Sequence, residues 1–260
     1  MAAFVAITRD VSAGLADCEL SFVDREPIDV ERARMQHHAY RQALEALGCR
    51  VIALPAQDAM ADAVFVEDVA LVFDEVAVMT RPGAQSRRAE GASVAEELGK
   101  HRELRMIEAP GTIDGGDVLL VGRKIYVGAS ARSNAAAIVQ LRALVAEFGY
   151  AVQGVPTRDC LHLKSAVTQV ADDTLLIQRE WVDRGVFAGY RLIDVDPSEP
   201  HAANALRIGD GVVYPANFPR TRQRMQDAGI AVTTVDVSEL QKAEGATTCC
   251  SLVFQDMDGV

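Results

Sequence analysis

Asp117-Val-Leu-Leu-Val-Gly-Arg-Lys-Ile-Tyr-Val127 is the stretch of sequence that decides the fold. Two short apolar runs flank Gly122-Arg123-Lys124, a pattern typical of a β-hairpin because glycine supplies the turn and the flanks are β-rich. Similar blocks begin near residues 68, 165 and 204, and Cys249 begins a fifth. Repetition at a period of about 40 to 50 residues indicates a propeller or another closed array of small sheets.

The hairpin blocks share one layout, in which two β-rich runs are separated by turn residues. The runs are 69–73 with 76–79, 117–121 with 125–127, 165–170 with 175–177, and 204–208 with 212–214. The fifth block, 251–254, has no second strand before the sequence ends, so we expect Phe4-Val-Ala-Ile7 to supply it and close the ring. The competing interpretation is an ordinary α+β sheet. No linker divides the chain, so we expect a single α/β domain over residues 1–260.

Helices are expected between the hairpins. Asp29 is placed to cap a helix that begins at Val30 and ends at Leu47, before Gly48. Ser133 is placed to cap another that reaches Phe148, with Gly149 beyond it. The remaining predicted helices are 88–98, 221–228 and 237–244.

Composition excludes several classes of partner. The chain is 49% hydrophobic and 24% charged, which is enough for a large core. Its net charge of −11 argues against nucleic acid or an anionic membrane as the main partner, although a solvated acidic surface is the common reason for such a charge. The start lacks a basic segment before a long apolar one, and no apolar run approaches transmembrane length. The five cysteines lack metal-ligand spacing, so we expect a cytoplasmic protein with reduced thiols.

Polar residues stand at the starts of the blocks, where strands of a closed array face its axis. Cys249, His162 and Asp114 supply a thiol, an imidazole and a carboxylate, the three residue types that activate a nucleophile. Taken singly, each has a structural interpretation: a buried cysteine, a core histidine, and a turn in Asp-Gly-Gly-Asp. Cys250 fits the buried interpretation better, since successive strand residues face opposite sides. Their shared position favours one catalytic centre.

Acidic and basic residues near these positions suggest the ligand. Asp62, Glu67 and Asp68 flank an apolar Val-Phe-Val segment, and clustered carboxylates in a partly dry pocket favour a cation such as a planar guanidinium. Arg87 and Arg132 each precede a predicted helix and together fit an α-carboxylate. A solvated loop and surface charges are the alternatives. The residue types fit a ligand like arginine.

Six segments together resemble dimethylarginine dimethylaminohydrolase, a family within the guanidino-group-modifying superfamily. They are Asp62-Ala-Val-Phe-Val-Glu-Asp-Val69, Thr80-Arg-Pro-Gly-Ala-Gln-Ser-Arg-Arg88, Thr112-Ile-Asp-Gly-Gly-Asp-Val118, Gly128-Ala-Ser-Ala-Arg-Ser-Asn134, Leu161-His-Leu-Lys-Ser165 and Thr248-Cys-Cys-Ser251. The resemblance runs from about Thr8 to Phe254. It implies a five-bladed α/β propeller, the pentein fold, with pseudo-fivefold ββαβ repeats.

The resemblance also implies a reaction without metal or cofactor, in which methylated arginine is hydrolysed to citrulline and a methylamine. It makes Cys249 the nucleophile, His162 the proton-transfer residue and Asp114 its acidic companion. The guanidinium side would be lined by Asp62, Glu67 and Asp68, and the α-carboxylate side by Arg87 and Arg132. Leu20 would belong to a mobile lid, and the backbone of Ala243 would touch the amino-acid end. The chain would act alone or as a homodimer.

Other functions share these residue types. An arginine deiminase or a citrulline-hydrolysing enzyme of the same superfamily would use the same thiol, imidazole and carboxylates. A non-catalytic arginine-binding protein would keep the pocket without turnover, and a structural propeller module would have neither. The intact set of Cys249, His162 and Asp114 favours an enzyme.

Overall fold

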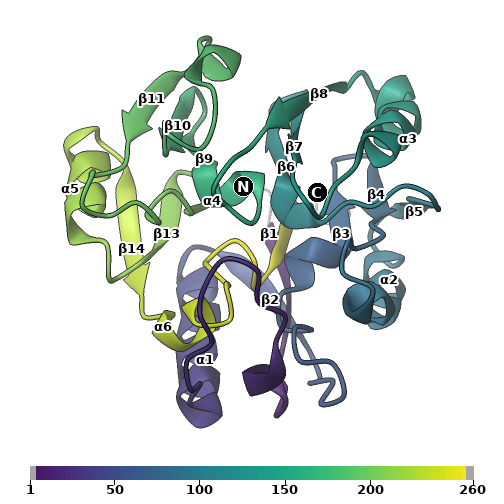
Figure 1. Ribbon diagram of the computed structural model, residues 1–260, viewed down its shortest axis with the longest axis horizontal. Helices are drawn as coiled ribbons and strands as arrows, with labels where there is room; N and C mark the ends of the chain where they lie inside the picture. Colours follow the sequence, from purple (N-terminus) through teal and green to yellow (C-terminus); the bar gives the residue numbers. More distant parts are fainter. Residues whose placement is uncertain (1–3, 256–260) are drawn as a thin grey trace.

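The computed structural model describes residues 4–255, and these form five three-stranded sheets arranged around a common centre (Figure 1). Four sheets follow one another along the chain. They are β3 (Ala70–Val72), β4 (Val76–Met79) and β5 (Glu103–Met106); β6 (Val118–Val121), β7 (Lys124–Ala129) and β8 (Ala151–Pro156); β9 (Val167–Ala171), β10 (Thr174–Ile177) and β11 (Arg191–Asp194); β12 (Leu206–Ile208), β13 (Gly211–Pro215) and β14 (Ala231–Val235).

The fifth sheet joins the two ends of the described chain. It consists of β15 (Leu252–Gln255), β1 (Phe4–Arg9) and β2 (Cys49–Leu54). Strand β15 runs antiparallel to β1, with Phe4 opposite Gln255 and Ile7 opposite Leu252. The predicted closure of the ring by Phe4–Ile7 is therefore confirmed.

Every sheet has the same internal topology. The middle strand pairs antiparallel with the first strand and parallel with the third. A parallel neighbour needs a crossover, which is usually a helix. The crossovers carry α1 (Val30–Ala46), α2 (Ala92–Leu98), α3 (Ala135–Val145) and α5 (Pro219–Asp227), while the β10–β11 crossover has only the short 3₁₀ helix η6 (Arg184–Phe187). This is the predicted five-bladed ββαβ array.

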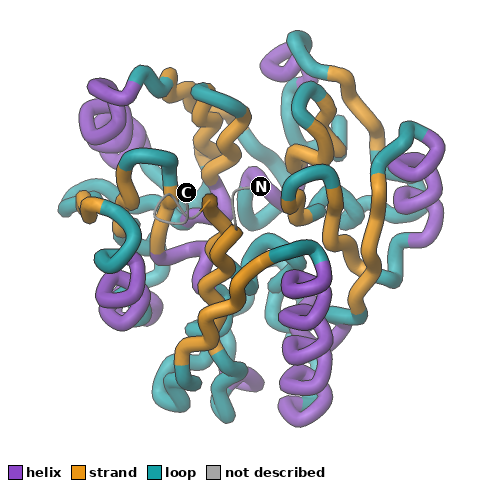
Figure 2. The backbone as a smooth tube through the Cα atoms, turned by 180° about the vertical axis from the view of Figure 1, so that it is seen from behind, coloured by secondary structure: helices purple, strands orange, loops and turns teal. Residues whose placement is uncertain are grey.

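The crossover helices α1, α2, α3 and α5 lie at the rim of the ring (Figure 1), and Figure 2 shows the outer helices from behind. The first strands of the five sheets line one common cavity. Short helical turns precede three of the first strands: η2 (Val66–Val69), η4 (Gly115–Asp117) and α4 (Leu163–Ala166). These turns carry the polar block-start residues, many of which are buried. The repeat thus brings polar side chains from separate blades to one place. Among residues 4–255, no helix is both long and apolar enough to cross a membrane.

Several predicted boundaries need correction. Asp29 caps α1 as predicted, since its side chain accepts a hydrogen bond from the Arg32 N–H. The cap of α3 is Asn134 rather than Ser133, because the Ser133 hydroxyl is bonded to the buried Asp117 carboxylate. Ser165 lies in α4 and Asn204 precedes β12, so the predicted strands that began at these residues are shorter.

The predicted helices also differ in length. The third continues past α3 as the 3₁₀ helix η5 (Ala146–Phe148), and Gly149 ends it with a left-handed φ of 77°. The second is divided into η3 (Ser86–Ala89) and α2, and the last shrinks to α6 (Ser238–Gln241). A further 3₁₀ turn, η1 (Leu15–Asp17), follows β1.

Candidate active site

Cys249 and His162 line one small cavity at the centre of the array. Residues from several blades and from the loop before α1 also line the cavity. Its lining residues are Glu19, Asp62, Phe65, Asp68, Arg87, Arg132, Leu161, His162, Ala243, Glu244, Gly245 and Cys249. The structure thus brings together most of the residues that the sequence singles out.

His162 is held between two carboxylates. Its Nε2 lies 3.1 Å from Asp114 Oδ2, and its Nδ1 lies 4.0 Å from Asp68 Oδ1. Asp114 is fully buried, and its other oxygen accepts a hydrogen bond of 2.8 Å from the Gly83 N–H. Burial opposes the charged imidazole, but the charge of Asp68 and the hydrogen bond that His162 donates to Asp114 outweigh it and raise the pKa of His162 to about 9. At neutral pH His162 is therefore an acid that can give up a proton.

The geometry around His162 explains the Asp-Gly-Gly-Asp motif. A Cβ atom on Gly115 would lie 1.9 Å from the Glu67 carbonyl oxygen, and one on Gly116 would lie 2.5 Å from His162 Nδ1. Both glycines are therefore required by close approach. Asp117 accepts hydrogen bonds from the Leu163 N–H at 2.9 Å and from the Ser133 hydroxyl at 2.6 Å, which fixes the turn that carries His162.

Cys249 lies in the loop before β15 and is half-buried. Burial, followed by the charges of Glu67 and Asp68, raises the pKa of the Cys249 thiol well above its ordinary value. The thiol is therefore protonated at neutral pH. Cys250 is fully buried in the core and its thiol contacts the Ala246 carbonyl, which agrees with the buried role predicted for it.

Asp68 and Arg87 form a buried ion pair at the wall of the cavity. Arg87 Nη1 lies 2.6 Å from Asp68 Oδ2, and Arg87 Nη2 lies 2.9 Å from Glu90 Oε2. Nη2 also donates to the carbonyls of Asp62 and Phe65. Burial acts against ionisation of Asp68, but His162 and Arg87 overcome it and lower the pKa of that carboxyl to about 2. Arg87 is thus locked into the wall rather than extended toward a ligand.

Replacing Arg87 by alanine is expected to lower the free energy of unfolding by about 3 to 5 kcal/mol, because it leaves Asp68 and Glu90 buried without their partner. Chemical denaturation measures this loss. The neighbouring Arg88 is exposed, so Arg88→Ala serves as the control and should change stability by less than about 0.5 kcal/mol. Equal unfolding midpoints for the two variants would contradict the structural importance of the pair.

Arg132 is the arginine with more freedom. Its Nη2 donates to the Ser21 hydroxyl at 3.1 Å, and its Nη1 lies 3.9 Å from Asp114 Oδ2. Its side chain is 12% exposed, against 5% for Arg87. Asp62 also lines this cavity. Its carboxylate accepts a hydrogen bond from the Glu19 N–H, and burial raises its pKa.

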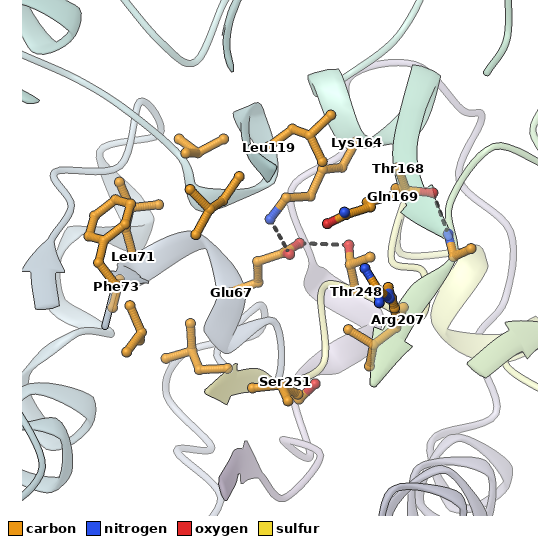
Figure 3. A pocket seen from close by; sticks show the side chains of 18 residues that line it. Glu67, Leu71, Phe73, Leu119, Lys164, Thr168, Gln169, Arg207, Thr248 and Ser251 are labelled. Carbon is orange, nitrogen blue, oxygen red and sulfur yellow. Dashed lines mark hydrogen bonds and ion pairs between the residues drawn. The ribbon is translucent and has the colours of Figure 1, made fainter. Parts of the chain in front are cut away.

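Glu67 is placed differently from the sequence-based expectation. Its carboxylate lies 2.6 Å from Lys164 Nζ and accepts a hydrogen bond of 2.8 Å from the Thr248 hydroxyl. It lines a second cavity, together with first strands of several blades (Figure 3). Its backbone N–H donates to the Cys249 carbonyl at 3.1 Å. Glu67 therefore contacts the loop that contains Cys249. It is not among the described residues that line the cavity shared by Cys249 and His162.

The loop before α1 covers one side of the cavity. Leu20 is half-buried and packs against the core cluster that includes Phe65, while its neighbour Glu19 lines the cavity. Ala243 is buried in the cavity wall, as expected. Sequence reasoning missed Glu244, whose backbone has a φ of 58° and whose carboxylate accepts hydrogen bonds from the N–H groups of residues 21–23. This contact latches the loop.

Replacing Glu244 by glutamine is expected to loosen that loop, because an amide offers one acceptor oxygen in place of two. Amide hydrogen exchange should accelerate at Ser21, Phe22 and Val23 by about tenfold, the ratio that a loss of about 1.4 kcal/mol produces. Mass spectrometry of peptides from this loop measures the change. Glu26→Gln in the same loop is the control, and unchanged exchange in Glu244→Gln would refute the latch.

Three donor groups lie close enough to be considered for a metal. Donor atoms of Asp68, Asp114 and His162 lie within 4.8 Å of one another. Arg87 already neutralises Asp68, and a pKa of about 9 keeps His162 protonated at neutral pH. A metal would have to displace that proton, since histidine binds metals as neutral imidazole. The group is therefore better suited to hold a proton on His162 than to hold a metal.

Comparison with known proteins agrees with the geometry. A family model described as N,N dimethylarginine dimethylhydrolase, eukaryotic, matches residues 21–253. Dimethylarginine dimethylaminohydrolase from Streptomyces coelicolor is 39% identical over 254 residues, covering 97% of each chain. The protein of that name from Pseudomonas aeruginosa is 36% identical over 228 residues, covering 87% of this chain and 90% of the relative.

Solved structures show the same likeness. A C249S variant of the Pseudomonas aeruginosa enzyme, complexed with citrulline, superposes with a TM-score of 0.93 at 34% identity and covers 98% of this chain and 100% of that chain. The N-terminal domain of the cyanobacterial arginine dihydrolase ArgZ superposes with a TM-score of 0.85 at 18% identity over 96% of this chain and 97% of that one, and so shares the fold. The chain belongs to the dimethylarginine dimethylaminohydrolase family.

Proposed function

We propose that this protein hydrolyses asymmetric dimethylarginine or monomethylarginine to citrulline and a methylamine, through a covalent thiouronium intermediate on Cys249. The observation that carries the proposal is the single cavity that holds Cys249, the protonated His162 and the carboxylates of Asp62 and Asp68. Its relatives bear the name of this activity. The solved relatives include one variant with citrulline and an H162G variant with an S-methyl-L-thiocitrulline adduct.

Binding uses the two signs of charge on the cavity wall. The guanidinium lies against the carboxylates of Asp62 and Asp68, because planar N–H donors pair well with carboxylate oxygens. Arg132 receives the α-carboxylate, and Arg87 holds the Asp68 carboxylate in place at the wall. The backbone of Ala243 contacts the amino-acid end, while the loop that contains Leu20 closes over the ligand. Glu67 acts indirectly, through its hydrogen bonds with the loop that contains Cys249.

The first chemical step forms a carbon–sulfur bond. As the guanidinium arrives, its positive charge favours loss of the Cys249 proton to solvent. The thiolate attacks the central guanidinium carbon and gives a tetrahedral species. His162, oriented by Asp114, gives its proton to the methylated nitrogen, the carbon–nitrogen bond breaks, and the neutral amine leaves. The product is a cationic thiouronium on Cys249 and a neutral His162.

The second step releases citrulline. His162 takes a proton from a water molecule, whose oxygen attacks the same carbon. The carbon–sulfur bond breaks and the thiolate leaves. The second water proton goes to solvent, so that His162 ends protonated and the product is a neutral ureido group. The attack on the carbon, the departure of the amine and the proton transfers of His162 all occur within the cavity that His162 and Cys249 share.

A substrate panel tests the function. We expect kcat/KM for monomethylarginine and asymmetric dimethylarginine to exceed those for arginine and citrulline, with dimethylamine released from the dimethylated substrate. Ammonia from arginine as the dominant product would instead indicate an arginine deiminase, and preferred turnover of citrulline would indicate a citrulline-hydrolysing enzyme. Tight arginine binding without any product would indicate a binding protein.

The proposal also covers the cellular compartment, the domain organisation and the oligomeric state of the enzyme. All five cysteines of the described chain are free thiols, which supports a reducing compartment such as the cytoplasm. We propose that residues 1–260 act as a single catalytic domain. The homodimer stays a prediction, which light scattering on the purified protein measures.

A further inference from the structure

Asn204 begins the fourth repeat, and it is the one block start without a role in the proposed mechanism. The other four block starts supply Asp68, Asp114, His162 and Cys249. Asn204 is 6% exposed, and its carboxamide lies among polar groups of two other blades. A buried amide is costly unless its donors and acceptors are paired, so its contacts show what it holds in place.

The Asn204 side chain is fully engaged. Its Nδ2 donates to the Thr248 hydroxyl at 2.9 Å and to the Lys164 carbonyl at 3.2 Å. Its Oδ1 accepts from the Thr248 N–H at 3.1 Å and from the Thr247 hydroxyl at 3.1 Å. These contacts use two donors and two acceptor positions, the whole capacity of a carboxamide. Neither an acid nor a hydrocarbon side chain can reproduce the set.

These contacts close a ring of interactions. Lys164 binds the Glu67 carboxylate through its ammonium, and Glu67 accepts from Thr248, as the dashed lines in Figure 3 show. Asn204 then joins Thr248 back to the Lys164 carbonyl. Residues from four blades take part. Lys164 stands two positions after His162, and Thr248 stands directly before Cys249.

We propose that Asn204 is a positioning residue that sets the placement of the Cys249 sulfur relative to the His162 imidazole. This inference rests on the proposed function, since it concerns the reaction in which the Cys249 sulfur and the His162 imidazole act on one substrate. Asn204 contacts the loops of the nucleophile and the acid and none of the acidic or basic groups that hold the substrate in that proposal. Its loss therefore acts on chemistry and leaves binding largely intact.

Asn204→Leu is the primary test, because leucine keeps the volume and removes the amide. We expect kcat to fall by about 30-fold or more while KM changes less than about threefold, since a misplacement of about 1 Å can cost about 100-fold in rate. Asn204 also lines a cavity with Trp181 and His201, so water can enter beside a smaller side chain. Asn204→Ala should accordingly lose less than Asn204→Leu. Asn217→Ala, at the rim of the same cavity, is the control and should match the parent protein.

A double-mutant cycle separates positioning from general destabilisation. Thr248→Val removes the hydroxyl that Asn204 contacts and should itself lower kcat, whereas Thr248→Ser keeps the hydroxyl and should retain activity. If both residues act through one network, the double variant Asn204→Leu with Thr248→Val should lose much less than the product of the two separate factors. Multiplicative losses would overturn the proposal, as would a raised KM with unchanged kcat.

A labelling experiment tests the role of Asn204 without turnover, so its result does not depend on whether the proposed function is correct. The rate of Cys249 labelling by a haloacetamidine, followed by mass spectrometry, reports the placement of the thiol directly. We expect Asn204→Leu to slow labelling by about tenfold or more for the same geometric reason. If the parent protein is labelled but does not consume methylarginines, the function is wrong and the labelling ratio still decides the role of Asn204. Equal labelling rates in a folded Asn204→Leu or Asn204→Ala variant would overturn it.

Discussion

Replacing Cys249 by serine is expected to lower kcat for asymmetric dimethylarginine by about a thousandfold or more. A serine hydroxyl is far less acidic than a thiol, and the carboxylates near this position disfavour any anion until the substrate binds. Dimethylamine release measures the loss. Acid-quenched mass spectra should show a thiouronium adduct on the parent protein during turnover and none on the variant.

Cys250→Ala controls for loss of the neighbouring thiol. Cys250 is buried in the core with its sulfur on the Ala246 carbonyl, so its removal should reduce stability but leave turnover per folded molecule within about threefold. Near-normal turnover by Cys249→Ser, or an adduct that maps to Cys250, would show that the wrong cysteine has been assigned.

Replacing His162 by glutamine is expected to lower kcat by about 10² to 10⁴-fold, the usual contribution of a positioned acid or base. The raised pKa of about 9 makes His162 the proton source for the leaving amine at neutral pH, and glutamine cannot supply that proton. Citrulline binding, measured by calorimetry, should weaken by less than about tenfold, because the binding carboxylates remain.

His38→Gln is the matched control for this substitution. His38 is exposed on α1, so its replacement should leave kcat unchanged. Addition of imidazole to His162→Gln gives a further check, because a small base that reaches the cavity can replace the missing group. Full activity in His162→Gln without such addition would contradict the role of His162.

The sequence predicts the fold well because the decisive signals are local. Turn residues such as Gly122 fix the hairpins. The last block contains one apolar run, and the apolar run Phe4–Ile7 pairs with it. The helix α1 is bounded by Asp29 and Gly48, and both act locally. Asp29 accepts a hydrogen bond from the Arg32 N–H, and Gly48 adopts a left-handed φ of 90°. The short η6 crossover is the exception in the ring, and a repeat pattern alone does not set the length of a crossover.

Side-chain direction is where the sequence is less informative. Ser133 and Asn134 are both suitable caps, and only the buried Asp117 carboxylate decides which of them is free to cap α3. Glu67 and Asp68 are adjacent, yet one faces Lys164 and the other faces His162 and Arg87. Spacing predicts that such residues meet at the axis, but it does not predict which carboxylate faces which partner.

Contacts between distant loops are the other part that spacing cannot supply. The Glu244 carboxylate reaches residues 21–23 and Asn204 reaches Thr248 only because the ring closes. The sequence position of Arg87 fits a ligand contact, and only the folded structure shows that this side chain is paired with Glu90 one turn away and with Asp68. These features depend on tertiary packing, since no local propensity favours them.

The proposed mechanism depends on an acid-lined cavity that keeps Cys249 protonated until a guanidinium is bound. The pH dependence of Cys249 alkylation, with and without a saturating, unreactive guanidine, measures this directly. Because burial and the nearby carboxylates raise the pKa of the thiol, alkylation alone should require alkaline pH, and the bound cation should shift the profile to lower pH. A profile that is unchanged, or that moves to higher pH when the guanidine binds, would contradict this mechanism.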